Sequence, residues 1–591
     1  MVRLRIPLRR AKPEERSPLK FALRLAKIYL MSEERRFAWL ALFAVIACNL
    51  GNVYIDVRIN QWNNAFYNAL QDFDAPAFFW QLGIFCLLAA ASMVLSVYAI
   101  YLNQMLQLRW RRWLTERYIG RWLAERTYFR MQLDREATDN PDQRISEDLN
   151  QFTTYALTLS LGLLSSVVSV VSFLFILWGL SGPADIDIFG WTTVHIPAYL
   201  VWAALLYAGA GTFLTIKIGR RLIPLTFSQQ RFEADFRFSL MRVRENAENI
   251  ALYGGERPER EVFRDRFARV YDNFWKIMKR RKAVNWFTSG YNQLAVVFPV
   301  LVVAPRYFSK QIQLGGLMQV IDAFVSVQAS LSFIVTSYTD IATWAAVTQR
   351  LSSFDQRMRD IGLTLEGQQT VESRRAGQGL EISSLDVDRP DGSRLLEDIR
   401  LNVAPSEAVL LTGSSGLGKS TLLRVLAGIW PYGGGGFRIG AGRAFFLPQR
   451  PYIPLGTLAT ALAYPEVAEP ALRPRIVKSL EQVGLGAFTA WLDESEDWPH
   501  RLSLGEQQRL AFARVLLAEP EIVFLDEATS ALDENVQTEL YSLLRNAPWH
   551  PTIISIGHRQ SLAKLHDRVL DLTQFRAREA TDTPPPVPAP S

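Results

Sequence analysis

The chain has 591 residues, of which 49% are hydrophobic and 12% aromatic, and a formal net charge of +7. This content is too apolar for a disordered protein, and the length allows several domains. The only cysteines, Cys48 and Cys86, lie in apolar stretches, which excludes a disulfide framework and a CxxC metal or redox site. Five histidines leave little room for a histidine-based metal centre.

Six apolar stretches long enough to cross a bilayer occur before residue 351: 37–55, 78–102, 155–180, 197–216, 286–304 and 317–338. The segments before and between them carry 11, 1, 9, 0, 17 and 2 Lys and Arg residues. Cytosolic loops collect basic residues, so we expect the N-terminus, the two long loops and everything after the sixth span in the cytosol.

The basic surplus therefore reflects topology and contact with anionic lipid, and we expect no nucleic-acid partner. We interpret residues 1–36 as a cytosolic basic tail. An organelle transit peptide is the alternative, but Glu14, Glu15, Glu33 and Glu34 are unusual for one.

The long loops, residues 103–154 and 217–285, are poor in Gly and Pro, which predicts helical arms that carry the membrane helices into the cytosol. Residues 352–379 are polar and predict a linker between a membrane domain (37–351) and a second domain (380–575). In that second domain, strand-like runs alternate with helical patterns, which is typical of a parallel α/β fold. Residues 576–591 form a Pro-rich tail that we expect to be disordered.

Residues 408–421 (AVLLTGSSGLGKST) read as an apolar strand, a glycine-rich loop and the start of a helix. This GxxxxGKS pattern is a phosphate-binding P-loop, in which backbone N–H groups and the helix dipole face the phosphates. The lysine is expected to reach the β- and γ-phosphates of ATP, and the serine hydroxyl to ligate Mg²⁺. The predicted ATP-binding residues are Gly413, Ser414, Ser415, Gly416, Leu417, Gly418, Lys419, Ser420 and Thr421.

A second apolar strand, IVFLDE at residues 522–527, ends in two acids. In P-loop ATPases the first acid helps to hold Mg²⁺ and the second polarises the attacking water. We therefore predict Asp526 as a metal residue and Glu527 as the general base. Alone, such a pair would more simply be a solvated strand end; the upstream P-loop favours the catalytic interpretation.

Between these motifs lies LSLGEQQRLAFAR (502–514), and ATSALD (528–533) and GHR (557–559) follow. Over about residues 380–575, this ordered set resembles the nucleotide-binding domain of ATP-binding cassette (ABC) transporters. The resemblance implies that Gln449 follows the γ-phosphate, adds to the Mg²⁺ site and contacts the membrane domain, and that His558 hydrogen-bonds the γ-phosphate. It also implies that Ser503 and Gly505 cap the γ-phosphate of ATP bound to a second subunit, with Asp533 at the dimer interface.

Two features depart from the family pattern. The common signature is LSGGQ, whereas Leu504 and Glu506 stand here in place of a Gly and a Gln. Because Ser503 and Gly505 are kept, we expect closure on ATP to survive. The aromatic residue that usually stacks on adenine is missing from residues 385–396, where Val387 or Arg389 could replace it.

Three further stretches, QWNNAFYNALQ (61–71), DNPDQRI (139–145) and RENAENIALYGGE (244–256), extend the resemblance over about residues 20–575. The chain is similar to the group of peroxisomal ABCD fatty-acyl transporters and their bacterial relatives. It is most similar to BacA/SbmA-related half-transporters with their own ATPase domain, whose mycobacterial members import cobalamin and other hydrophilic compounds. The resemblance implies a polytopic α-helical membrane domain with six transmembrane helices of the exporter type, fused to an α/β P-loop ABC ATPase domain.

One chain supplies one ATPase domain, so the resemblance implies a homodimer in the bilayer, located in the bacterial inner membrane. Residues 140–148 and 244–256 are candidate coupling helices; the alternative is that they are solvated loops. Polar residues in or beside the predicted spans suggest a wet cavity and a hydrophilic cargo, such as a cobalamin-like compound or a peptide. They are Asp56, Asn60, Asn63, Asn64, Asn292, Gln293, Asp322 and Gln328. The alternatives are that these groups pair between helices, that the cargo is acyl-CoA or lipid, or that the protein is a membrane-anchored regulatory ATPase.

Overall fold

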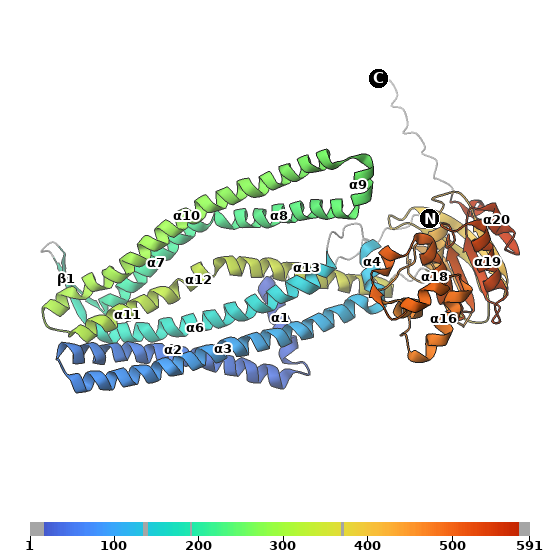
Figure 1. Cartoon of the computed structure of the whole chain (residues 1–591). Coiled ribbons are helices and arrows are strands. Elements are labelled where there is room, and N and C mark those ends of the chain that lie inside the picture. Colours follow the sequence, from blue (N-terminus) through green and yellow to red (C-terminus); the bar gives the residue numbers. More distant parts are fainter. Residues whose placement is uncertain (1–16, 134–139, 189–191, 368–370, 578–591) are drawn as a thin grey trace, which may run out of the picture. The chain divides into compact units, whose positions relative to one another are not determined.

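The computed structural model describes residues 17–133, 140–188, 192–367 and 371–577 (Figure 1). Internal contacts divide the chain into two units. The first comprises Met1–Gly120 and Asp139–Gln356, and the second comprises Arg121–Thr138 and Arg357–Ser591. A short piece of the first predicted cytosolic loop therefore belongs with the C-terminal domain.

The first unit is helical, with one β-hairpin, β1 (Pro183–Ile188) and β2 (Thr192–Pro197). Within the described residues, six helices are long and apolar enough to cross a membrane, and each contains most of one predicted span. They are α2 (Arg35–Gln71), α3 (Ala75–Leu123), α6 (Leu149–Ser181), α7 (Tyr199–Gly219), α10 (Glu256–Phe308) and α11 (Leu314–Leu331). The predicted six-helix membrane domain is confirmed, and the chain is a multi-pass membrane protein.

The second long loop is an extension of membrane helices. α8 (Leu222–Glu245) and α10 lie side by side, with the short helix α9 (Ala247–Tyr253) at the turn (Figure 1). α10 has 53 residues, which corresponds to a length of about 80 Å. The expected helical arm is therefore present, and α9, within the predicted coupling segment 244–256, has no buried residue.

The sixth span ends earlier than its apolar pattern predicts. α11 stops at Leu331, and α12 (Phe333–Thr336) and α13 (Tyr338–Gly367) continue the path as separate helices. The Ser332 hydroxyl donates to the carbonyl of Gln328, and the Thr336 hydroxyl donates to the carbonyl of Phe333. Such bonds from Ser and Thr back to the preceding turn bend helices, and hydropathy does not reveal them.

The other predicted coupling segment, residues 140–148, is tied into the first unit. It consists of α5 (Pro141–Gln143) and a π-helical turn, η2 (Arg144–Asp148). Asp148 is 1% exposed and accepts hydrogen bonds from Arg144 (2.7 Å) and, through both of its oxygens, from Arg350 on α13 (2.7 and 3.0 Å). The carboxylate of Asp148 is thus buried between two guanidinium groups. The end of the segment is therefore anchored, which a freely solvated loop would not be.

The second unit is an α/β domain with two sheets. A five-stranded parallel sheet has the order β13 (Arg568–Asp571), β6 (Ala408–Thr412), β12 (Thr552–Ile556), β11 (Ile522–Asp526), β8 (Ala444–Leu447). A four-stranded sheet has the order β3 (Val371–Arg375), β7 (Gly433–Ile439), β4 (Leu380–Asp388), β5 (Arg394–Val403). The helices include α14 (Lys419–Leu426), α15 (Leu458–Ala463), α16 (Arg473–Gln482), α18 (Leu504–Ala518) and α19 (Glu534–Arg545). Together with the membrane helices, this domain confirms the predicted fold class.

The predicted linker, residues 352–379, is wrong over most of its length. α13 runs on to Gly367, and residues 371–375 form β3, which pairs with β7; residues 368–370 lie outside the described part. Leu351, Phe354 and Met358 are buried at helical spacing, a pattern that extends the helix despite the polar composition. Of the predicted C-terminal tail, residues 578–591 also lie outside the described part.

Candidate nucleotide-binding site

Four neighbouring parallel strands deliver the predicted site residues to one edge of the five-stranded sheet. β6 leads into the P-loop, Gln449 follows β8, Asp526 ends β11 and His558 follows β12. Carboxyl ends of parallel strands share an edge, and open α/β sheets bind ligands in the crevice outside it. β6, β11 and β12 are almost fully buried, and β8 is half-buried, so apolar packing holds this edge in place.

The P-loop connects β6 to α14 through backbone conformations that need glycine. Gly413 has φ +140°, Gly416 has φ +78° and Gly418 has φ +109°. At Gly413 a Cβ atom would also lie 2.7 Å from Leu417 Cδ2. The spacing of glycines in the motif therefore follows from the turn, which exposes backbone N–H groups ahead of the helix.

Lys419 lies in the first turn of α14 and is 7% exposed. Its Nζ donates to the carbonyls of Gly413 (2.8 Å) and Ser414 (2.9 Å). Burial lowers the pKa of Lys419, and the carboxylates of Glu527 and Asp526 oppose this shift. The ammonium group thus donates to carbonyls of the P-loop itself. Phosphate oxygens of a bound nucleotide would replace these carbonyls as acceptors.

The predicted metal residues lie together. The Ser420 hydroxyl donates to Asp526 Oδ1 at 3.0 Å, and burial raises the pKa of Asp526, opposed by this hydrogen bond. A hydroxyl, a carboxylate and the amide oxygen of Gln449 are hard oxygen donors, which suit Mg²⁺ shared with phosphates. Within the described residues, no group of three His, Cys, Asp or Glu side chains could hold a metal.

Glu527 is held from two sides. Gln449 Nε2 donates to its Oε2 at 2.9 Å, and His558 Nε2 lies 3.4 Å from its Oε1. The backbone of Glu527 has φ +48°, a left-handed conformation that costs a non-glycine residue about 1–3 kcal/mol and recurs at functional sites. The structure therefore groups Gln449 and His558 around Glu527, the predicted general base.

Ser503, Gly505 and Asp533 have local roles within this chain. Ser503 and Asp533 cap the N-termini of α18 and α19, where their side chains accept from the backbone N–H groups of Glu506 and Val536. Ser503 Oγ and N both donate to Glu506 Oε2, at 2.8 and 2.9 Å. A Cβ on Gly505 would lie 3.4 Å from the carbonyl of Ala531, so the signature packs beside the segment leading to Asp533.

Sequence reasoning missed two buried polar residues that join these motifs. Gln508 is 1% exposed; its amide nitrogen donates to the carbonyl of Gln449 (3.1 Å) and to Ser530 Oγ (3.2 Å), and its Oε1 accepts from Ala531 N (3.0 Å). It occupies a core position of α18, one turn before Phe512. A polar residue on the apolar face of a helix is the sequence feature that could have identified it.

Arg514 is the second missed residue. It is 7% exposed and donates to the carbonyls of Tyr452 and Ala461, both at 2.7 Å. Burial lowers its pKa to about 10. Because it binds the segment just after Gln449, Arg514 links α18 to the chain beside this predicted γ-phosphate contact.

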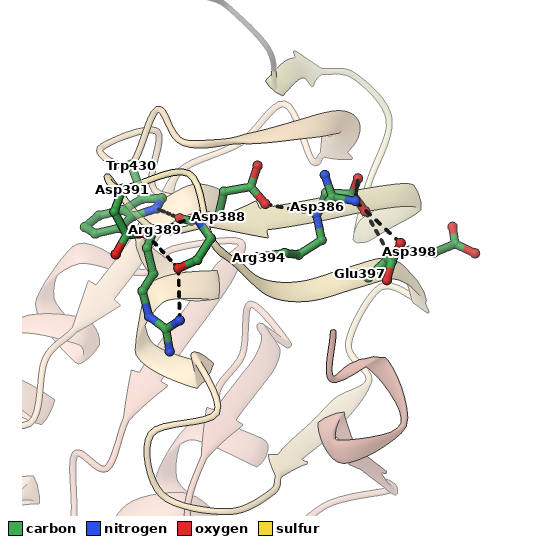
Figure 2. A network of polar contacts seen from close by, with 9 residues as sticks. Asp386, Asp388, Arg389, Asp391, Arg394, Glu397, Asp398 and Trp430 are labelled. Atoms are coloured by element: carbon green, nitrogen blue, oxygen red, sulfur yellow. Dashed lines mark hydrogen bonds and ion pairs between the residues drawn. The ribbon is translucent and has the colours of Figure 1, made fainter. Parts of the chain in front are cut away.

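The two candidates for adenine contact differ in exposure, and Figure 2 draws one of them, Arg389. Val387 is fully buried in the core of the four-stranded sheet, so it was a wrong candidate. Arg389 is exposed on the β4–β5 turn, where its Nη1 donates to Ser393 Oγ at 3.1 Å. Trp430 donates to the carbonyl of Asp388 at 2.9 Å and fixes the base of the turn. Arg389 stays a prediction.

The second unit also includes part of the first predicted arm, residues 103–154. This part contains η1 (Ala124–Arg126) and α4 (Thr127–Leu133). Glu125 and Arg126 have φ +51° and +60°, which breaks the path from α3. Arg126 Nη1 donates to the carbonyl of Ala427 at 2.8 Å. Ala427 is the C-cap of α14, where a cation complements the helix dipole. The observed contact with the ATPase domain thus precedes the predicted segment 140–148.

Comparisons with known proteins agree with this architecture. Residues 25–308 match the family described as ABC transporter transmembrane region 2, and residues 396–530 match the family described as ABC transporter. Along 93% of this chain and 95% of its own, a solved structure of a bacterial Atm1-family ABC exporter with ATP bound has a similar fold, with a TM-score of 0.67 and 19% identity.

Three curated relatives extend over most of the chain. The chloroplastic ABC transporter D family member 2 of Arabidopsis thaliana is 34% identical over 96% of this chain and 88% of its own length. The inner membrane ABC transporter ATP-binding protein YddA of Escherichia coli is 33% identical over 93% and 96%. The human lysosomal cobalamin transporter ABCD4 is 28% identical over 90% and 91%. The chain therefore belongs to the ABC transporter family, as an ABCD-like half-transporter that fuses a transmembrane region to an ATP-binding domain.

Proposed function

We propose that two copies of this chain form an ATP-driven transporter that moves a hydrophilic solute across the bacterial inner membrane. The observation that carries the proposal is the grouping of Lys419, Ser420, Asp526 and Glu527 with Gln449 and His558 at one sheet edge. The E. coli relative named an inner membrane protein supports the location.

The chemistry assigned to this edge is ATP hydrolysis. Lys419 would exchange its two carbonyl acceptors for β- and γ-phosphate oxygens, and Ser420 and Asp526, with Gln449, would hold Mg²⁺. When bound, the metal offsets phosphate charge. Glu527 would accept a proton from the water that attacks the γ-phosphorus, as the bond to the β–γ bridging oxygen breaks and ADP and phosphate leave. His558 would hydrogen-bond the γ-phosphate.

The second copy is needed to complete each site. Within this chain, Ser503 and Asp533 cap their own helices, so in this proposal the γ-phosphate is capped by Ser503 and Gly505 of the other copy. ATP would then close the two ATPase domains, and hydrolysis would reopen them. This cycle would switch access to the membrane domain between the two sides.

Most of the predicted polar residues of the membrane helices fall into two sets, and Gln328 is buried. Asn60 Nδ2 donates to Asp322 Oδ2 and Asn64 Nδ2 donates to Gln319 Oε1, both at 2.7 Å; these groups pair between α2 and α11, as the alternative interpretation proposed. Asp56, Asn292 and Gln293 are exposed in the single chain. This second set, and the human relative named a cobalamin transporter, support a hydrophilic cargo.

Proteoliposomes test the proposal directly. We expect ATP to drive uptake of a hydrophilic solute from a panel of cobalamin and peptides, and Glu527→Gln to abolish uptake while ATP still binds. Glu534→Gln, an exposed acid in the first turn of α19, is the matched control. Uptake at the wild-type rate by Glu527→Gln would exclude the transport mechanism. Stimulation of ATP hydrolysis by acyl-CoA alone would favour the acyl carrier, and hydrolysis without uptake of any compound would favour the regulatory ATPase.

A further inference from the structure

The loop of residues 528–532 joins two predicted functional residues, Glu527 and Asp533. Its outer side is exposed at Ser530, and its inner side packs into the ATPase domain, where Leu532 is 7% exposed. The loop is also tied to its own beginning, because the backbone N–H of Ser530 donates to the carbonyl of Glu527 at 3.0 Å. A displacement of this loop would therefore reach the predicted general base.

Arg559 holds the inner side of the loop. It follows β12 and is the direct neighbour of His558 in the chain. Its Nη1 donates to the carbonyl of Leu532 at 2.7 Å, and its Nη2 donates to the carbonyl of Ser530 at 2.9 Å. A guanidinium group presents its donors in a rigid planar fork. Bonds to two carbonyls of one loop therefore fix the loop relative to the backbone beside His558.

A buried amide makes a second connection between the same two segments. Gln537 in α19 is 0% exposed. Its Oε1 accepts from Thr529 Oγ1 at 3.2 Å and lies 3.5 Å from Arg559 Nη1, and its Nε2 donates to Ser561 Oγ at 3.2 Å. Thr529 belongs to the loop and Ser561 to the turn after Arg559, so this amide also holds the two segments at a fixed separation.

The contacts of Arg559 serve geometry and not charge pairing. Its side chain is half-buried, and in the described part of the chain its partners are the carbonyls of Ser530 and Leu532 and the amide oxygen of Gln537. An arginine that stabilised the domain through charge would face a carboxylate. Loss of the fork is therefore expected to change the position of the loop more than the electrostatics of the domain.

We propose that Arg559 is a positioning residue that couples the loop at 528–532 to His558, so that contact of a second copy with the loop moves His558 relative to Glu527. His558 Nε2 lies 3.4 Å from Glu527 Oε1, which is long for a hydrogen bond, so a small shift of the His558 backbone changes this contact. The inference rests on the proposed function, in which Asp533 lies at the dimer interface. It adds a route by which each ATP site responds to the other copy.

Rates of ATP hydrolysis by the full chain in nanodiscs test the inference. Arg559→Gln removes the fork, and we expect kcat to fall roughly tenfold while the KM for ATP changes less than about twofold, since a misplaced His558 affects the reacting phosphate more than ATP binding. Arg559→Lys keeps the charge without the fork and is expected to lose roughly threefold in kcat. Arg475→Gln is the matched control. Arg475 also donates to a backbone carbonyl, that of Leu517 at 2.9 Å, and its loss is expected to leave kcat unchanged.

A double-mutant cycle separates positioning from a merely structural role. In a His558→Ala background, Arg559→Gln is expected to change kcat less than about twofold, because the residue through which Arg559 acts is absent. An equal fold loss in both backgrounds would overturn the inference, and so would the wild-type kcat in folded Arg559→Gln. Arg559→Lys takes the same place in the cycle if Arg559→Gln does not fold.

A second measurement covers the case in which His558→Ala hydrolyses too little ATP to be compared. In a Glu527→Gln background that traps ATP, modification of His558 by diethyl pyrocarbonate, followed by peptide mass spectrometry, reports how accessible its imidazole is. We expect ATP to slow this modification and Arg559→Lys to remove most of the protection, with unchanged bound ATP per chain. Equal protection with and without Arg559→Lys would overturn the inference. Hydrolysis at the wild-type rate by Glu527→Gln would instead contradict the proposed function, so the two failures are distinguishable.

Discussion

Glu506 restrains the signature serine in the isolated chain, and Glu506→Gln is expected to release it. Ser503 Oγ and N both donate to the Glu506 carboxylate, and in the proposed dimer the hydroxyl would exchange this acceptor for the γ-phosphate. Hydrogen bonds to a charged acceptor are roughly twice as strong as neutral ones, and a neutral bond contributes about 1 kcal/mol. Glutamine keeps the shape of the side chain and an acceptor oxygen. Freeing the Ser503 hydroxyl from residue 506 therefore costs about 1 kcal/mol less at each of the two proposed ATP sites.

This difference corresponds to about fivefold tighter binding at each of the two caps of a dimer. The assay is the ATP concentration that half-saturates closure, measured from the distance between spin labels on the two ATPase domains in a Glu527→Gln background that traps the closed form. We expect Glu506→Gln to lower this concentration. Glu506→Ala also frees Ser503, but it removes half of the capping box and destabilises the start of α18. An unchanged or higher ATP requirement for Glu506→Gln would show that the carboxylate does not compete with nucleotide for Ser503.

Three other substitutions test contacts within the two units. Asp148→Asn leaves the arginines around Asp148 uncompensated and is expected to lower stability by about 3–5 kcal/mol, seen as a lower thermal unfolding midpoint; a midpoint equal to that of wild type would contradict a buried ion pair. Arg126→Gln removes the cation from the end of α14 and is expected to reduce the stimulation of ATP hydrolysis by cargo more than basal hydrolysis, whereas equal loss of both rates would argue for a merely structural role. Gln508→Leu keeps the volume but breaks three hydrogen bonds, so hydrolysis should fall while nucleotide binding persists; unimpaired hydrolysis would refute the link between the motifs.

The sequence predicts the fold class well because two strong sequence signals indicate it. Long apolar runs identify the membrane helices, and the P-loop between a strand and a helix identifies the α/β domain. The ends of helices and linkers are predicted less well where amino-acid composition and side-chain packing disagree. Polar residues between 352 and 367 suggested a linker, but Leu351, Phe354 and Met358 bury one face of a continuing helix.

Within the nucleotide site, sequence order supplied the residues but not their partners. The motif at 413–420 follows from local turn chemistry, whereas the contacts of Gln508 with Gln449 and Ala531 join segments far apart in the chain. Val387 could not be separated from Arg389 because the sequence did not show where the strand ends: β4 stops at Asp388, so Val387 is buried within the sheet and Arg389 lies in the exposed turn. The roles of Ser503 and Asp533 depend on a second copy and stay predictions.

Because α10 is long, a small tilt of this helix displaces its far end by a large distance. A rigid rod of about 80 Å that pivots by about 5° at one end moves its other end by about 7 Å, more than one helical turn. Angular changes of a few degrees among the membrane helices are then sufficient to relocate the exposed helix α9, without unwinding a single residue along the way.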